Sequence, residues 1–327
     1  MATTIPLYKL TPEIVSLLQE IEYSKSAIEN ISLPIKIEQN IRRQSVLSSS
    51  LYSAKIEGNR LHLADLTGRP DSDKEKIEIF NILKAINFVL SDNSQDFSVE
   101  DIKKLHEIVM SGLLASPGHF RTEMNAIFNS QGIVVYLPPP PILVEPLLIN
   151  LINYINDDSQ EKIAVIKACI AHYVFEKIHP FIDGNGRVGR LILQMVMHKK
   201  GYGMKGLLSV EEYLNEHRLG YYQSLEEPES DITGYLTYML KAISETSKKA
   251  KELVMSKISY TESDLLLPRR LEILNLINDH QLVTFDFIRR RFTKINDRTL
   301  RYDLKFLQDK NFITKLGNTN GVHYRPA

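Results

Sequence analysis

The sequence predicts a mainly α-helical protein with one small β-hairpin and a separate basic tail. Apolar residues recur at helical spacing through most of the chain, and before the tail only one turn-forming quartet separates two short β-prone runs. The composition then shifts near residue 256. The chain has 327 residues, which is long enough for two or three domains. Because 43% of the residues are hydrophobic and 24% are charged, the chain is too apolar to be disordered.

The first part of the chain is expected to contain only helices and polar turns, because its apolar residues follow a helical period. They include Ile14, Leu17, Leu18, Ile21, Ile79, Leu83, Ile86 and Leu90. Ser98 and Asp101 then fit a helix-start box, and Ser116, Pro117 and Gly118 end that helix. We therefore expect an N-terminal helical region over 1–97, a core over 98–250, and a linker with a further domain over 251–327.

The hairpin is expected over Ala126–Phe128 and Ile133–Tyr136, which flank the turn-forming residues 129–132. Four prolines, Pro138 to Pro141, should end the second strand and keep the backbone extended. Helical periodicity then predicts four further helices, over Val144–Asp157, Glu161–Ile178, Arg187–Lys199 and Val210–Leu225.

Charge and cysteine content narrow the class of protein. Forty basic and forty acidic residues balance, but residues 261–327 hold 12 basic and 8 acidic side chains, so the tail carries +4 and the rest −4. The single cysteine, Cys169, excludes an intrachain disulfide and a cysteine-based zinc site. The N-terminus lacks a basic and apolar leader, and no apolar run approaches about 18 residues. We expect a soluble cytoplasmic protein with no membrane contact.

The densest chemical signal is the twelve-residue segment HPFIDGNGRVGR, which begins at His179. Pro180 disfavours helical geometry at His179, and a new helix opens near Arg187. Gly184 and Gly186 permit positive φ angles, which would let main-chain N–H groups converge on an anion. The helix N-terminus adds partial positive charge, so the segment predicts a phosphate site.

The side chains of the segment complete a phosphate-transfer chemistry. Arg187 and Arg190 lie three residues apart and can reach further phosphate oxygens. Asp183 is compatible with phosphate if a Mg²⁺ ion lies between them, and His179 can take up a proton near neutral pH. A dinucleotide fingerprint is excluded because no strand precedes the glycines, and no Walker A sequence occurs. The alternative is a glycine-rich turn with a capping histidine.

This segment resembles the Fic family, whose motif HPFx[DE]GNGRxxR it matches at every defined position. The resemblance implies an all-helical core with a hairpin flap and the transfer of AMP from ATP to a protein hydroxyl. By the same resemblance His179 would be the general base, Asp183 the Mg²⁺ ligand and Phe181 a packing anchor. Gly184, Asn185 and Gly186 would contact the α- and β-phosphates. Arg187 would support the leaving diphosphate, and Arg190 would contact the γ-phosphate.

Upstream, Ser53–Gly58 resembles the family's inhibitory motif [ST]xxxE[GN]. Ser53 and Glu57 are four residues apart and share a helix face, and Gly58 allows the helix to end. The carboxylate of Glu57 would form a bidentate pair with Arg190 in the space of a γ-phosphate. The resemblance thus implies the class with an N-terminal inhibitory helix. The alternatives are an exposed helix charge, or a carboxylate that positions water for removal of AMP.

The resemblance extends over about residues 30 to 245. Pro117–Arg121 looks like the family's PGxxR segment before the flap, where a target segment would pair by strand addition. The flap candidates are Ile133, Val134, Val135 and Tyr136; alternatively they only cover the core. Asn215, Tyr221 and Tyr222 lie where relatives contact adenine, although a core-packing tyrosine pair is the other reading. We expect His172 to be structural.

The tail is expected to contain two short helices around residues 271–288, a third over 296–310, and strands over Phe312–Leu316 and Val322–Arg325. This is the order of a winged helix-turn-helix, and residues 298–304 resemble the recognition helix of bacterial winged-helix regulators. The polar face of that helix carries four DNA-binding candidates, Arg298, Arg301, Tyr302 and Lys305. The alternative uses of such a domain are dimerisation and presentation of a protein target.

Two function hypotheses follow. The first is an autoinhibited transferase that uses ATP and Mg²⁺ to attach AMP to a hydroxyl of a target protein or of itself, or works in reverse. The second is a DNA-binding regulator whose Fic core senses nucleotide. Some relatives transfer phosphate, UMP or phosphocholine, so another donor is a further alternative. The sequence does not determine the oligomeric state; many relatives dimerise, so the resemblance makes a homodimer one alternative.

Overall fold

A computed structural model describes residues 5–66, 73–92, 94, 96–128, 134–258, 262–293, 295–317 and 322–327. The chain divides into two compact units, one made of Met1–Ser32 with Arg42–Met255 and the other of Leu33–Ile41 with Ser256–Ala327. The described residues are mostly helical, as predicted, with two small antiparallel sheets. None of the helices among them is long and apolar enough to cross a bilayer. The finer boundary at residues 97 and 98 remains a prediction.

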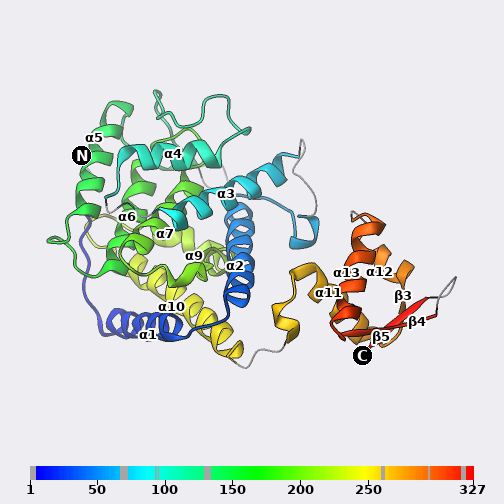
Figure 1. Ribbon diagram of the computed structural model, residues 1–327. Helices are drawn as coiled ribbons and strands as arrows, with labels where there is room; N and C mark the ends of the chain where they lie inside the picture. The colour runs from blue at the N-terminus through cyan, green and yellow to red at the C-terminus, as the bar shows by residue number, and fades with distance from the viewer. Residues whose placement is uncertain are drawn as a thin grey trace. The chain divides into compact units, whose positions relative to one another are not determined.

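The first unit is a helical assembly around α6 and α7 (Figure 1). These two helices pack directly together, and α3, α4 and α5 pack against them. Almost every side chain of α6 is buried, which makes it the central helix of the unit. The helices are α1 (Pro12–Asn30), α2 (Ile35–Ile56), α3 (Lys74–Ser91), α4 (Val99–Val109), α5 (Pro141–Asn156), α6 (Ala164–Ile178), α7 (Asn185–Lys199), α8 (Val210–Glu216), α9 (Arg218–Leu225) and α10 (Thr233–Ser256).

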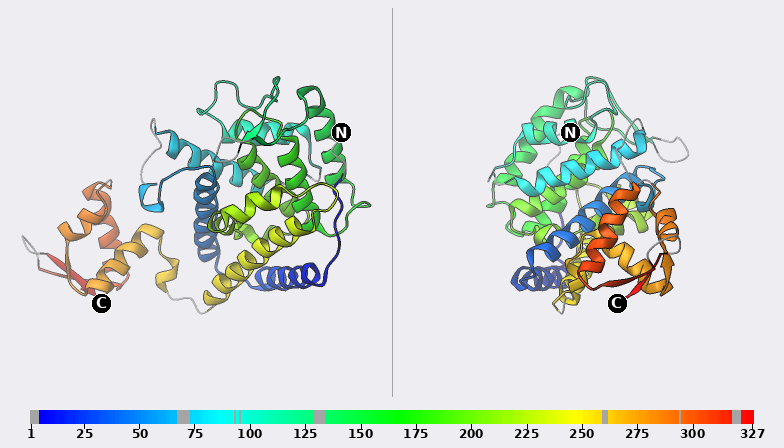
Figure 2. Two further views of the ribbon diagram at one scale, coloured as in Figure 1. Left: turned by 180° about the vertical axis from the view of Figure 1, so that it is seen from behind. Right: turned by 45° about the vertical axis from the view of Figure 1, so that its right-hand side comes forward.

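Local sequence signals account for several helix starts. The predicted box at the start of α4 is confirmed, since the Asp101 N–H donates to Ser98 Oγ at 3.2 Å and the Ser98 N–H donates to Asp101 Oδ2 at 2.8 Å. Thr11 caps α1 in a similar way. The segment before α1 runs along the outside of the unit (Figure 2), where the Leu7 N–H donates to the Glu229 carbonyl.

Several helices differ from their predicted bounds: α6 begins at Ala164 rather than Glu161, α7 begins at Asn185 rather than Arg187, and two further differences have a local cause. The proline run was expected to be extended throughout, but α5 begins at Pro141 because a proline needs no N–H partner at a first helical position. The single helix predicted over Val210–Leu225 is wrong, because His217 has non-helical angles (φ −115°, ψ 37°) and separates α8 from α9. A helical period cannot reveal a one-residue interruption of this kind.

The predicted hairpin is confirmed in its strands. β1 (Ile127–Phe128) pairs antiparallel with β2 (Val134–Tyr136), and Ile127 lies opposite Tyr136. The hydroxyl of Tyr136 donates to the Lys177 carbonyl at 3.0 Å, which ties the hairpin to the end of α6. The predicted turn, the flap candidate Ile133 and the side chain of Val135 lie outside the described residues.

Besides the first part of α2 and a 3-10 turn over Glu262–Leu265, the described residues of the second unit form three α-helices and three short strands. Sequence analysis missed β3, because two residues are too few for an alternating pattern. β3 and β4 flank β5 in one antiparallel sheet. The elements are α11 (Pro268–His280), β3 (Val283–Thr284), α12 (Phe285–Arg291), α13 (Asp297–Asp309), β4 (Ile313–Leu316) and β5 (His323–Pro326). The assignment of this unit as a winged helix remains a prediction.

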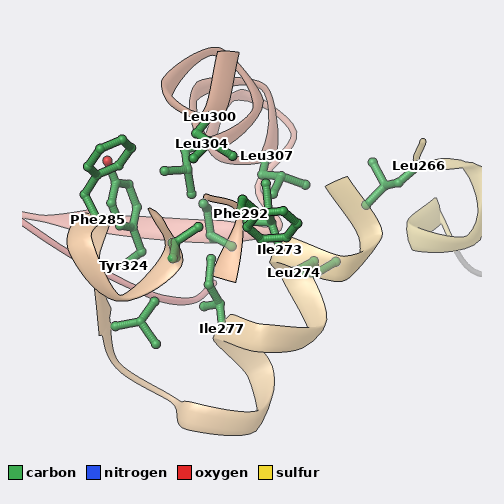
Figure 3. Packing of buried hydrophobic residues seen from close by; sticks show 13 residues of the cluster. Leu266, Ile273, Leu274, Ile277, Phe285, Phe292, Leu300, Leu304, Leu307 and Tyr324 are labelled. Atoms are coloured by element: carbon green, nitrogen blue, oxygen red, sulfur yellow. The ribbon is translucent and has the colours of Figure 1, made fainter. Parts of the chain in front are cut away.

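A small apolar core holds the second unit together. Figure 3 shows Leu300, Leu304 and Leu307 of α13 pointing toward the side chains of α11, and all three leucines are buried. Beside them Asp303 is fully buried, and its two carboxylate oxygens accept from Arg269 Nε at 2.5 Å and Arg270 Nε at 2.9 Å. A buried carboxylate needs such partners, so this pairing joins α13 to α11.

Candidate active site

The chain reverses direction between α6 and α7 in the segment that the sequence singled out. His179 follows the last residue of α6 with a left-handed conformation (φ 50°, ψ 60°), and Gly184 precedes α7 with φ 84°. The prediction of a positive φ at Gly186 is wrong, because α7 begins at Asn185 and Gly186 is helical. Gly186 is needed for space instead, since a Cβ there would lie 2.6 Å from Glu57 Oε1.

The interior of this turn is held by one side-chain amide and one aromatic ring. Asn185 Oδ1 accepts from the Phe181 N–H, and Asn185 Nδ2 donates to the Phe181 carbonyl, both at 2.9 Å. The Phe181 ring is fully buried and stacks on His106, with ring centroids 3.7 Å apart. Both polar atoms of the Asn185 side chain are therefore occupied by hydrogen bonds within the turn, so only the main-chain N–H of Asn185 is available for an anion.

His106 is a site residue that sequence analysis missed. The Gly118 N–H donates to His106 Nδ1 at 2.7 Å, so the ring proton lies on Nε2, which donates to the Asp183 carbonyl at 3.1 Å. Burial lowers the pKa of His106 to about 4, so the ring is neutral at pH 7. A single histidine on the buried face of α4 belongs to no sequence pattern that would predict this contact.

The N-terminal turn of α7 is the place where the sequence predicts an anion site. The first bond of the helical ladder runs from the Val188 N–H to the Gly184 carbonyl at 3.0 Å, so the N–H groups of Asn185, Gly186 and Arg187 precede the ladder. Such N–H groups and the helix dipole favour a negative charge. Arg190 is in the second turn of the same helix and its side chain is 1% exposed.

A carboxylate of the protein itself lies at this anion site. Arg190 Nη2 donates to Glu57 Oε1 at 2.8 Å and to the Ser53 carbonyl at 2.9 Å, while Arg190 Nε donates to Ser53 Oγ at 3.0 Å. Glu57 thus makes one contact with Arg190 rather than the predicted bidentate pair, while Ser53 accepts from Nε and also from Nη2. α2 ends at Ile56, and Glu57 lies with Gly58, which has φ 102°, in the turn that follows the helix. Glu57 is not a free surface charge.

Arg187 is held between two carboxylates. Its Nη2 donates to Asp183 Oδ1 at 2.9 Å, and its Nη1 donates to Glu78 Oε1 at 2.6 Å. Burial raises the pKa of Glu78, and the guanidinium of Arg187 opposes that shift. Arg187 Nε is buried without a hydrogen-bond partner among the described residues, so one donor remains for a phosphate oxygen. Sequence analysis missed Glu78, which lies 109 positions away in the chain.

Asp183 is the residue that suits a cation. Its side chain is 59% exposed, so solvent and ligands can reach the carboxylate. The described part of the chain contains no cluster of three or more His, Cys, Asp or Glu side chains that could hold a metal ion. Mg²⁺ commonly binds through one or two carboxylates, substrate phosphates and water, and a single accessible carboxylate beside an anion site fits that mode.

His179 is mostly buried at the end of α6. Burial lowers the pKa of its imidazole to about 4. The Glu176 main-chain carbonyl opposes this shift, because it favours the protonated ring. The His179 carbonyl accepts from Arg121 Nε at 2.9 Å, and the same guanidinium donates to the carbonyls of Glu123 and Pro139. Arg121, the last residue of the PGxxR-like segment, therefore joins the base candidate to the chain on both sides of the hairpin.

The structure separates the adenine candidates. Tyr222 is 40% exposed, its hydroxyl donates to the Ile56 carbonyl at 3.3 Å, and the Arg218 guanidinium lies 5.6 Å from its ring centroid. Tyr221 is buried, and its hydroxyl lies 3.0 Å from Nε2 of the buried His172. Asn215 is half-buried. Of the tyrosine pair, only Tyr222 is open to a ligand.

The four DNA-binding candidates lie together on α13 of the second unit. Arg298, Arg301, Tyr302 and Lys305 are all exposed. The guanidinium of Arg301 lies 3.9 Å from the centroid of the Phe285 ring, which orients it by a cation–π contact. The exposed Arg289, Arg290 and Arg291 at the end of α12 add further positive charge to this unit.

The part of the chain that contains this site is similar to a known protein family. Residues 96–197 match the family model described as the Fic/DOC family. The chain carries a Fic/DOC domain. Two proteins named protein adenylyltransferase fic-1, from Caenorhabditis briggsae and Caenorhabditis elegans, are 28% and 29% identical over 62% of this chain and 41% of their own length. The chain thus spans less than half the length of these relatives.

Solved structures extend the likeness in fold. A Fic family protein from Desulfovibrio desulfuricans G20 superposes with a TM-score of 0.67 and 23% identity over 98% of each chain. Fic-1 from C. elegans superposes with a TM-score of 0.59 and 21% identity over 75% of this chain and 72% of that one. The fold around the Fic domain is therefore shared well beyond residues 96–197.

Gly184→Ala should destabilise the first unit, because a Cβ at φ 84° would be strained and would lie 2.7 Å from Met110 Sδ. The left-handed conformation costs about 1–2 kcal/mol for a residue with a Cβ. The close contact between the new Cβ and Met110 should add about 1 kcal/mol or more, which is the usual cost of overpacking a core. The measurement is the free energy of unfolding in urea. Gly201→Ala is the matched control, since Gly201 has φ 80° and nothing within 4 Å of its Cβ position. Equal losses in both variants would contradict the contact with Met110.

Proposed function

We propose that this protein is a Fic-type protein adenylyltransferase that its own Glu57 holds inactive. The observation that carries the proposal is the Glu57 carboxylate on Arg190, directly above Gly186 at the N-terminus of α7. A helix N-terminus with a buried arginine is built for an anion, and here a glutamate takes the anion's place. The names of the Caenorhabditis relatives support adenylyl transfer as the reaction.

ATP is the proposed co-substrate. The N–H groups of Gly186 and its neighbours would bind the α- and β-phosphates, and Arg190 would bind the γ-phosphate once Glu57 withdraws. The unpartnered Nε of Arg187 would donate to the diphosphate. The exposed ring of Tyr222 would stack on the base. Asp183 would hold Mg²⁺, which when bound supplies positive charge that neutralises the phosphates.

His179 is the proposed general base. Its neutral imidazole accepts the proton of the acceptor hydroxyl as the oxygen attacks the α-phosphorus of ATP. The new bond joins the acceptor oxygen to the AMP group, and the bond from the α-phosphorus to the bridging oxygen breaks to release diphosphate. Arg121 keeps the base in place through the His179 carbonyl.

The acceptor hydroxyl is proposed to arrive on an extended target segment. β1 and β2 form a two-stranded sheet, and Val134 on β2 is 46% exposed. A target strand added at the edge of this hairpin would be aligned by main-chain hydrogen bonds, independently of its side chains. The hairpin is joined to the end of α6 by Tyr136, so it would present that segment near His179.

Glu57 inhibits, in this proposal, by competing with the γ-phosphate. A hydrogen bond to a charged group is worth roughly 1.5–3 kcal/mol, and Arg190 can satisfy only one anion in this position at a time. ATP bound without that contact would lie in an unproductive pose. The same carboxylate could position water for the hydrolytic removal of AMP, which would restore the hydroxyl of the target and release free AMP.

A second candidate function is DNA binding by the second unit. It rests on the exposed basic residues of α12 and α13, together with the exposed Tyr302. Basic side chains on one helix face contact phosphates or base edges in proteins of this type. This activity would be independent of His179.

Glu57→Gly should raise the incorporation of AMP from ATP labelled at the α-phosphate by about ten-fold or more, because Arg190 then becomes available to the γ-phosphate. The Glu57→Gly, His179→Ala double variant should return incorporation to background. Intact-mass spectrometry after incubation with ATP and Mg²⁺ measures both, and a gain of one AMP group identifies the donor chemistry. Undiminished incorporation without His179 would refute its assignment as the base.

The pH dependence of the Glu57→Gly protein tests the environment of His179. Burial lowers the pKa of His179 to about 4, so the proton is already lost at lower pH than in an ordinary histidine and the base form dominates from pH 5 upward. We expect kcat/KM to be constant between pH 6 and 8 and to fall only below about pH 5. A decline with an apparent pKa near 6.5 would show that the imidazole is exposed to water in the free enzyme.

Replacement of both Arg298 and Arg301 by alanine should weaken binding to duplex DNA and reduce its salt dependence, because about two phosphate contacts are lost. Fluorescence anisotropy at several salt concentrations measures this. Replacement of Lys103 and Lys104 on α4 removes the same charge from the first unit and is the control. Equal affinity in both double variants would exclude α13 as a DNA contact.

A further inference from the structure

The inhibitory helix α2 has a second polar attachment, one turn before Ser53. Ser49 Oγ donates to Glu211 Oε2 at 2.6 Å, and Gln194 Nε2 donates to Glu211 Oε1 at 2.6 Å. Gln194 Nε2 also donates to Ser49 Oγ at 3.1 Å. One residue each from α2, α7 and α8 thus forms a closed cluster, the Ser49–Gln194–Glu211 cluster.

This cluster repeats the attachment at Arg190 one helical turn away. Ser49 and Ser53 are four residues apart and share one face of α2, and Glu57 is the first residue after the end of that helix. On the facing helix, Gln194 follows Arg190 by four residues. The two contact levels therefore lie in register along the same pair of helices.

Burial makes the cluster dependent on the position of α2. Ser49 is 1% exposed and Glu211 is 2% exposed. Burial raises the pKa of Glu211, while the Ser49 hydroxyl and the Gln194 amide donate to its carboxylate and oppose that rise. If α2 moved away, Glu211 would lose one of these two donors in a buried place, which is costly for a carboxylate.

The apolar packing beside the Ser49–Gln194–Glu211 cluster contains a small gap. A cavity of about 30 Å³ lies beside the cluster, and both Ser49 and Gln194 line it. Its other walls include Val46, Leu193 and Val210. The hydrogen bonds to Glu211 therefore lie beside a small gap in the apolar packing, whose walls lack some contacts that a filled core would have.

We propose that the Ser49–Gln194–Glu211 cluster is a second latch of the inhibitory helix, with Glu211 as the positioning residue. It acts through Glu57, because it fixes the position of α2 along α7 at which the Glu57 carboxylate contacts Arg190. The inference rests on the proposed function in one respect only, the consequence for AMP transfer. The mechanical part, that the cluster holds the end of α2, stands without it.

Hydrogen exchange of the full chain tests the mechanical part. Ser49→Ala and Gln194→Met each remove hydrogen bonds to Glu211, and exchange of the amides of residues 53–57 should become about ten-fold faster, since a buried hydrogen bond to a charged group changes an equilibrium by about that factor or more. Ser50→Ala is the matched control, because the Ser50 hydroxyl is equally buried but donates only to the Val46 carbonyl of its own helix. Unchanged exchange in both cluster variants, or the same increase with Ser50→Ala, overturns the latch.

AMP incorporation tests the consequence. Ser49→Ala and Gln194→Met should raise it about ten-fold while Glu57 is present, and should add nothing in a Glu57→Gly background. A loss of incorporation in the Glu57→Gly background would mean that the cluster only supports the fold, and the latch would be wrong. If Glu57→Gly itself incorporates no AMP, the proposed function fails, and the exchange measurement still decides whether the cluster holds α2.

Discussion

Arg190 carries a positive charge where water does not reach it, and this single constraint organises the site. A buried guanidinium requires acceptors for its donors, and here the Ser53 hydroxyl, the Ser53 carbonyl and the Glu57 carboxylate supply them. The need can be met by α2 or by a bound phosphate, but one position accommodates one anion. In the proposed function, an exchange of partners at Arg190 would therefore link the position of α2 to the binding of a nucleotide.

The rest of the turn is built to keep its shape through such an exchange. The Asn185 amide closes the turn on Phe181, the His106 ring supports it from α4, and the Arg121 guanidinium holds the carbonyl of His179. None of these contacts involves α2. Loss of Glu57 from Arg190 would therefore leave the base candidate and the main-chain N–H groups where they are, which is what a site needs if it is to be inhibited reversibly.

Charge is arranged around the site in a graded way. Arg190 is almost completely buried, Arg187 is held between Glu78 and Asp183, and Asp183 itself is mostly exposed. The positive charges that would bind phosphate thus lie inside, and the carboxylate suited to a cation faces solvent. In the proposed function, an anionic ligand would contact the arginines on the buried side, and Asp183 would hold the cation on the side that faces solvent. This order follows from the depth of each side chain rather than from its identity alone.

The sequence by itself determined the parts of this protein whose geometry is local. The turn from His179 to Arg190, the i, i+4 spacing of Ser53 and Glu57, the hairpin strands and the box at Ser98 all depend on residues within a few positions of one another. Only the tertiary structure decided the supports of the site: the His106 contact to Asp183, the Glu78 contact to Arg187 and the Ser49 contact to Glu211 span 77, 109 and 162 positions of the chain. Such partners are chosen by the packing of apolar helix faces, and no periodicity in the chain records which polar residue a buried face will bring alongside another.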